Sequence, residues 1–302
     1  MKKIHLLVFS FMVSASAYAQ TKADSLQPVL VQKINQASSW LSRNGFQVRR
    51  SFDGSKEEAK PAAIAWNSDY ENKKFYTLID VGIKLTELEV LPNSEQVALL
   101  FYPKAEWHRN TINDDAKKKN NLMGGINTEF FWLIADHWYT RPLITASFDY
   151  KKDFVKDIKT TQTKGYLTFN GSKDGEPGAP VRNRTKAVVF KYFPYTGLEH
   201  YRNIGTSGQK ASMWSNRLYF ELYPLSSYQY QYIQLTFDYT CRKVFNDSLY
   251  NQGDMSWFSL GLNFFPGGNE KLGLGLDYSQ GEDPSSNFVK TKLLALGIKL
   301  KI

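Results

Sequence analysis

The chain has 302 residues, a mass of 34.7 kDa, a formal charge of +9 and an isoelectric point near 9.3. Aromatic residues make up 15% of it, yet its mean hydropathy is only −0.43, which excludes a bundle of apolar membrane-spanning helices. One cysteine excludes a disulfide framework and any metal or redox site built on paired cysteines. Lys and Arg are spread over the whole chain, so no nucleic-acid partner is predicted.

Residues 1–19 have the features of a secretory signal peptide. Lys2 and Lys3 form a positive start, an apolar stretch covers residues 4–13, and Ala17-Tyr18-Ala19 is a cleavage site with small residues at its first and last positions. A short buried helix is the alternative interpretation. No cysteine follows the apolar stretch, so a lipoprotein is not expected. The sequence therefore predicts export.

Residues 20–59 form a separate N-terminal segment. Apolar residues recur at helical spacing between Leu26 and Leu41, and Asn44-Gly45 supplies a left-handed end. The pattern predicts one short amphipathic helix followed by a polar linker. A single helix cannot fold alone, so its apolar face must pack on something else. We expect it to lie in the periplasm or inside a barrel as a plug, and both positions stay open.

From residue 60 to residue 302 the hydrophobic period is two. In the last segment Leu294, Leu296, Ile298, Leu300 and Ile302 alternate with small or charged residues, as one-sided strands require. About twelve strands are predicted: 60–68, 74–88, 95–108, 122–134, 142–151, 161–170, 184–195, 212–223, 228–242, 255–265, 270–279 and 289–301.

The connectors alternate in predicted length. Tight turns are expected at 91–94, 224–227 and 266–269. Long polar loops are expected at 109–121, 152–160, 196–211, 243–254 and 280–288. Residues 172–183 depart from this alternation, because a short turn is expected there. Short turns at one end and long loops at the other are typical of an outer-membrane barrel.

Three features favour a barrel in lipid over a soluble β-sandwich. The strands have about the ten residues that a tilted strand needs to cross the hydrocarbon layer. Aromatic residues gather at strand ends, as in Phe130-Phe131-Trp132, where interfacial girdles form. The polar face of the strands is charged, which suits an apolar outside and a wet inside. A secreted soluble β-protein remains the second alternative.

The signal peptide, the alternating strands and the connector pattern resemble Gram-negative outer-membrane β-barrel proteins over residues 60–302. The resemblance is to an architectural class, and no family motif carries it. The chain ends in Leu300-Lys301-Ile302, where members of the class usually end in an aromatic residue that the assembly machinery recognises. The resemblance to this class implies an all-β, transmembrane antiparallel β-barrel in the outer membrane. It also implies membrane lipids and the barrel-assembly machinery as partners.

The charged face of the strands predicts the lining of a narrow lumen. Twelve strands leave more room than eight, which side chains just fill, and less than the sixteen of a wide channel. The expected lining residues carry both signs: Asp80, Lys84, Lys104, Glu106, Glu129, Asp149, Lys191, Arg217, Glu221, Asp238, Arg242, Asp277, Lys299 and Lys301. A weakly selective pore and a salt-bridged interior both fit this pattern.

No catalytic constellation stands out. His108, His137 and His200 remain after cleavage, and no Gly-x-Ser-x-Gly elbow accompanies them. No cofactor or metal is expected. The function predicted is a monomeric narrow passive channel or a structural surface barrel, with lipopolysaccharide as a further candidate partner at the charged loop of residues 114–119. The alternative is an outer-membrane lipid hydrolase using His108, near the outer rim, or His200, in a long loop.

Overall fold

The chain divides into two compact units, and all residues with a described structure belong to the second. The units comprise residues 1–43 and 44–302. The computed structural model describes residues 46–52, 61–69, 74–91, 94, 96–113, 118–132, 141–169, 171, 173–182, 188–205, 208–224, 231–268 and 271–301. The predicted signal peptide, the predicted helix and His137 lie outside these residues.

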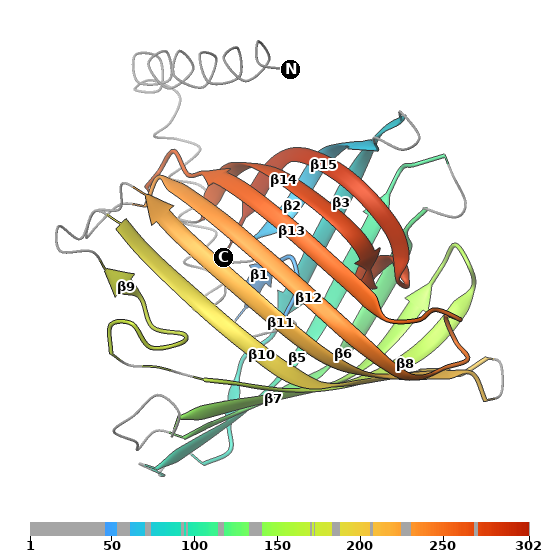
Figure 1. The fold of residues 1–302 in the computed structure, drawn as a ribbon, viewed down its shortest axis with the longest axis horizontal. Coiled ribbons are helices and arrows are strands. Elements are labelled where there is room, and N and C mark those ends of the chain that lie inside the picture. Colours follow the sequence, from blue (N-terminus) through green and yellow to red (C-terminus); the bar gives the residue numbers. More distant parts are fainter. Residues whose placement is uncertain are drawn as a thin grey trace. The chain divides into compact units, whose positions relative to one another are not determined.

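Twelve long strands form the wall of the second unit (Figure 1). They are β2 (Ala62–Asp69), β3 (Lys74–Lys84), β5 (Val97–Asn110), β6 (Asn120–Trp132), β7 (Pro142–Asp153), β8 (Ile158–Phe169), β10 (Val188–Asn203), β11 (Lys210–Pro224), β12 (Ile233–Asp247), β13 (Met255–Phe264), β14 (Leu272–Asp283) and β15 (Val289–Leu300). Three short strands pair with the wall: β1 (Gln47–Arg49) and β4 (Leu88–Glu89) with β3 and β5, and β9 (Val181–Arg182) with β10.

The wall closes on itself. Each long strand pairs antiparallel with its neighbours in the chain, and β15 pairs with β2 from Leu300↔Ala62 to Leu293↔Asp69. In Figure 1 the red end of the chain accordingly runs beside the blue beginning of the wall. Closure satisfies every strand edge, which a sheet in lipid requires. The predicted antiparallel barrel of about twelve strands is confirmed.

The two faces of the wall have opposite character. On β15 the side chain of Leu296 is 57% exposed, whereas that of Lys299, which points to the other face of the strand, is 3% exposed. The same inversion holds around the barrel, with large apolar side chains outside and buried polar ones inside. An apolar outer surface and a polar interior are the arrangement that a lipid solvent selects. Among the described residues no helix is long and apolar enough to cross a membrane.

The two ends of the barrel differ from the expected connector pattern. We call the end that carries the chain's entry into β2 and its exit from β15 the proximal end, and the other end the distal end. The distal connectors at 154–157 and 204–209 are shorter than the predicted loops 152–160 and 196–211. The proximal connector between β8 and β10 includes β9 and is long, as the departure at residues 172–183 indicated.

The prediction of long distal loops was therefore wrong in part. Residues such as Tyr201-Arg202-Asn203 look like loop in the sequence but continue the ladder of β10 opposite β11 and β8. Backbone pairing continues without apolar side chains once a strand has left the hydrocarbon layer, so the hydrophobic pattern ends before the strand does.

Candidate functional site

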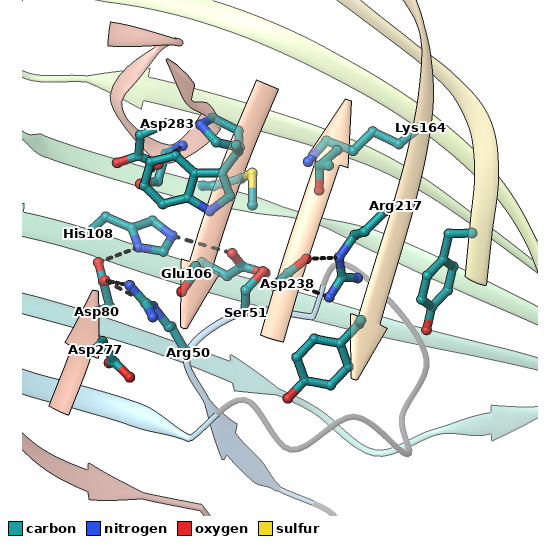
Figure 2. A pocket seen from close by; sticks show the side chains of 18 of the residues that line it. Arg50, Ser51, Asp80, Glu106, His108, Lys164, Arg217, Asp238, Asp277 and Asp283 are labelled. Carbon is teal, nitrogen blue, oxygen red and sulfur yellow. Dashed lines mark hydrogen bonds and ion pairs between the residues drawn. The ribbon is translucent and has the colours of Figure 1, made fainter. Parts of the chain in front are cut away.

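The barrel interior contains a cavity of about 210 Å³ that is lined mainly by charged and polar residues. Figure 2 shows charged side chains of both signs reaching into it from several strands, among them Arg217 and Asp238, and His108 with Asp80 and Glu106. A cavity of this size, lined by charged groups, has room for several water molecules. Three groups of side chains bound the cavity.

The first group holds Arg50, Ser51 and Phe52 inside the barrel. We call these three residues the inner strap. Two Arg50 nitrogens contact Asp80 Oδ2, Nε at 3.2 Å and Nη2 at 3.1 Å. The Phe52 backbone N–H donates to Glu106 Oε1 at 2.9 Å, and the Phe52 carbonyl accepts from Asn127 at 2.9 Å. A Cβ at Gly82 would lie 3.1 Å from the Phe52 ring, so the glycine gives the strap its room on the wall.

His108 joins the two carboxylates that hold the strap. Its Nδ1 lies 2.8 Å from Asp80 Oδ1 and its Nε2 lies 3.4 Å from Glu106 Oε2 (Figure 2). Burial opposes the charge on Arg50, but the carboxylates of Asp80, Asp277 and Asp283 raise its pKa above the ordinary value. The strap is thus fixed to β3 and β5 by charge-assisted hydrogen bonds, of which the one from Phe52 to Glu106 is buried and the Arg50–Asp80 pair is partly exposed.

The second group lies at the distal end and crosses the lumen. We call residues Asp283–Phe288, which include the 3-10 helix η2 (Pro284–Ser286), the distal latch. Lys119 Nζ contacts Asp283 Oδ2 at 2.9 Å, and Asn121 donates to the Ser285 carbonyl at 2.9 Å. β7 lies opposite β14, because equally many strands separate the two in either direction around the wall. Asn287, which follows β14, nevertheless reaches β7.

Asn287 accepts from Lys151 at 2.7 Å and donates to Asp153 Oδ2 at 2.7 Å, and both partners are on β7. Phe288 is fully buried against Tyr201, Met213 and Met255. Its φ of 61° lies in the left-handed region, which is an outlier for a bulky residue. Strain of this kind persists only where surrounding contacts hold it, so the latch is held across the lumen from both sides.

The third group is a wall of arginine and tyrosine on β8, β10, β11 and β12. Arg217 donates to both Asp238 oxygens, at 2.7 and 2.9 Å, and its guanidinium carbon lies 5.1 Å from the ring centres of Tyr195 and of Tyr219. Glu199 accepts from Tyr166 at 2.7 Å, from Tyr201 at 2.5 Å and from Arg242 Nε at 3.0 Å. We call the set Lys164, Tyr166, Glu199, Arg217, Asp238 and Arg242 the basic wall.

The residues expected to line the lumen lie as follows. Asp80, Lys84, Lys104, Glu106, Glu129, Asp149, Glu221, Arg242 and Lys299 are buried. Arg217, Asp238 and Asp277 are nearly buried in ion pairs, Asp277 with Lys299. Lys191, opposite Glu221 in the register, and Lys301, just beyond β15, are half-buried. Several of these form ion pairs with each other, such as Lys104 Nζ with Asp149 Oδ1 at 3.4 Å.

The sequence analysis placed two interior residues, His108 and Lys119, wrongly. His108 was expected near the outer rim but is buried in the lumen, and Lys119 was expected in a solvated loop but is buried against Asp283. The expectation of a long loop around His200 was wrong, because that residue lies in β10 on the outer face. Glu199, its neighbour, faces inward. The parity of β10 was the available signal, and the polar outer residues near its distal end masked it.

His200 has one neighbour of chemical interest. Its Nδ1 lies 2.8 Å from the Ser212 hydroxyl of β11, on the exposed side of the barrel. The described residues contain no group of three or more His, Cys, Asp or Glu side chains placed to hold a metal ion. Among the residues that the structure describes, no third side chain orients the His200 imidazole, and a serine–histidine pair without such a group is incomplete as a nucleophile.

Comparisons with known proteins find similar solved structures of outer-membrane proteins but no matching family. No family model matches the chain, and no curated protein matches it. Among solved structures it is similar to the NanC porin (7% identity, TM-score 0.44, 80% of this chain and 100% of that chain). It is also similar to a bacterial polysaccharide outer membrane secretin (8%, 0.42, 86% and 99%) and to the β-domain of the Bordetella autotransporter BrkA (9%, 0.38, 85% and 98%).

Similarity at this level transfers no function. The strand pairing and the inverted faces of the wall define the chain's class, a membrane-spanning antiparallel β-barrel.

Proposed function

We propose that this protein is an outer-membrane β-barrel that forms a narrow passive channel, closed in the state described by the distal latch. The observation that carries the proposal is the pair of hydrogen bonds that Ser285 and Asn287 accept from Asn121 and Lys151 of the far wall. They lie at the end of a cavity lined by charged side chains. A barrel with a purely structural role has no need of a wet interior bounded by a separate closing segment.

The predicted signal peptide and the apolar outer face support the outer membrane as its location, with membrane lipids around the wall. In this proposal the distal end faces outward, as it does when both chain ends are periplasmic. The sheet closes within one chain, so no second chain is needed to complete the wall, and the proposed form is a monomer that the barrel-assembly machinery inserts.

The latch is held by two separable kinds of contact, which allows a direct test. Asp283→Asn weakens the ion pair with Lys119, and Phe288→Ala removes the aromatic wedge from the pocket of Tyr201 and Met213. A charge-assisted hydrogen bond of this kind contributes about 1.5–3 kcal/mol. The double variant is therefore expected to spend far more time open.

The experiment is single-channel recording in planar bilayers with the refolded full chain. Asp254→Asn is the matched control, because Asp254 lies in another distal connector and pairs with Lys243 outside the lumen. We expect rare openings for the wild type and the control, and frequent discrete steps for the double variant. Silence from all three folded proteins would favour a structural barrel. A wild type that is steadily open would show that the latch does not close the lumen.

The lipid hydrolase is the alternative to the proposed channel, and the contact that bears on it is the 2.8 Å one between His200 and Ser212 on the outer face. Fatty-acid release from phospholipid vesicles tests it. Release that Ser212→Ala abolishes would establish the hydrolase, and its absence would exclude this pair as catalytic.

A further inference from the structure

A row of cations crosses the distal ends of four neighbouring strands of the wall, β7, β8, β10 and β11. The register places Lys152 of β7 directly opposite Lys159 of β8, and Arg202 of β10 directly opposite Lys210 of β11. Arg202 also lies opposite Thr161, two residues from Lys159, so the two pairs are diagonal neighbours. We call Lys152, Lys159, Arg202 and Lys210 the distal basic patch.

The distal basic patch faces outward and is open to its surroundings. Along each strand a residue next to the patch is buried, so strand alternation turns the patch to the outer face. These buried neighbours are Lys151, Thr160, Tyr201 and Ala211. Three of the four patch residues are exposed, and the side chain of Lys152 is 31% exposed.

The charges of the patch are only partly matched within the chain. Like charges directly opposite each other on adjacent strands repel, and an anion between them removes the repulsion. One carboxylate serves in this way, since Asp157 Oδ1 lies 3.2 Å from Lys152 Nζ. Among the described residues no carboxylate forms an ion pair with the other three patch residues. The patch therefore needs anions from outside the chain.

Other cations at the distal end have acidic neighbours. Lys243 on β12 pairs with Asp254 at 2.7 Å, and Lys290 on β15 lies opposite Glu282 on β14. The two like-charged pairs set the sector of β7, β8, β10 and β11 apart from these positions.

The patch lies at the depth of lipid headgroups. On the outer face Tyr150 precedes Lys152 by two residues and is 42% exposed, and Trp214 lies four residues from Lys210 toward the proximal end and is 40% exposed. Exposed aromatic side chains of this kind gather where hydrocarbon meets headgroups. Two to four residues of a tilted strand place the patch about 5–10 Å beyond that boundary, within the headgroup region.

We propose that the distal basic patch binds the phosphates of a surrounding lipid that carries phosphomonoester groups without a cation of its own. A guanidinium binds phosphate through two parallel hydrogen bonds, and the ammonium groups add point charges. In the proposed orientation the distal end meets the outer leaflet, where lipopolysaccharide has this chemistry. The lipid's identity rests on that orientation, and the binding surface itself does not depend on conduction.

The test is equilibrium binding of lipid A to the full chain in a neutral detergent, followed by thermophoresis. Lipid A with both phosphates is the probe, and the same lipid after removal of its phosphates is the matched control. Each cation near a lipid surface contributes about fivefold in affinity. We therefore expect the phosphorylated lipid to bind at least about tenfold more tightly. Equal binding of the two lipids would overturn the proposal, and so would displacement of lipid A by an equal concentration of inorganic phosphate.

Two double variants locate the surface. Lys159→Gln with Arg202→Gln removes two central cations of the patch and is expected to weaken lipid A binding by at least about tenfold. Lys243→Gln with Lys290→Gln makes the same change in net charge at the same end of the barrel, and its affinity is expected to stay within about threefold of the wild type. Heat-modifiable migration on gels verifies that both have folded. Unchanged binding by the first variant, or an equal loss in the second, would refute the assignment.

Lipid binding and conduction fail separately. Selective binding of phosphorylated lipid A by a protein that never conducts would retain the patch and reject the channel. Steps in conductance from a protein with no such selectivity would retain the channel and reject the patch.

Discussion

A lysine in place of Leu296 tests the orientation of the wall at its closing seam. Leu296 lies in the middle of β15, opposite Trp66 of β2 and Leu276 of β14, and its side chain is 57% exposed on the outer face. If that face meets hydrocarbon, Leu296→Lys costs about 2–4 kcal/mol near the membrane midplane. That is a decrease of roughly 30- to 900-fold in the folding equilibrium.

Leu300→Lys is the matched control, with the same substitution on the same face four residues toward the proximal end. Four residues of a tilted strand span about 10 Å of membrane depth, where the cost falls to about 0–1 kcal/mol. Folding into vesicles of fixed composition is followed by urea titration and by heat-modifiable migration on gels. Equal costs for the two variants, or a larger cost at Leu300, would show that β15 does not present this face to lipid at the depth inferred.

Three further predictions concern single sites. Cys241 lies on the outer face of β12 beside Tyr239, so it should react faster with a lipid-soluble maleimide than with a charged one, and the opposite order would mean that the face points inward. Arg50→Ala removes the cation that Asp80 holds, so amide hydrogen exchange in residues 46–52 should speed up by at least about tenfold, and unchanged protection would mean that other contacts hold the strap. The His200–Ser212 pair is expected to be non-catalytic, so purified protein should release no fatty acid from vesicles, contrary to what a hydrolase would do.

Much of the wall was predictable from alternation. On β12 and β15 one face is apolar at every second residue, and a shift by one residue would reverse both faces at once, so the register is strongly specified. The strand predicted at 161–170 appears as β8, whose backbone pairs with β7 on one side and β10 on the other.

The two segments that cross the lumen, the distal latch and the inner strap, were not predictable. Lys119 contacts Asp283 and Lys151 contacts Asn287 across separations of 164 and 136 residues, which no local pattern encodes. Pro284-Ser285-Ser286 looks like an ordinary turn in the sequence. The inner strap was likewise hidden in what looked like a polar linker, although Gly82 on the facing strand leaves room for it.

The acidic and basic residues of the lumen were predictable as a set but not as pairs. Strand parity places Glu199 and Arg242 inside, yet their contact joins strands that are not neighbours in the sheet. The curvature of a closed barrel decides which interior side chains meet, and strand count alone does not fix it.

The distal latch is the central feature of the proposed channel, and a reversible tether tests its role most directly. Asn121 and Ser285 are hydrogen-bonded across the lumen, so cysteines at both positions, in a Cys241→Ser background, allow the latch to be locked by oxidation. Single-channel recording of the same bilayer before and after addition of a reductant gives the measurement. We predict that openings are absent while the disulfide is intact and return on reduction. Openings of equal frequency in the oxidised protein would contradict closure of the lumen by this segment.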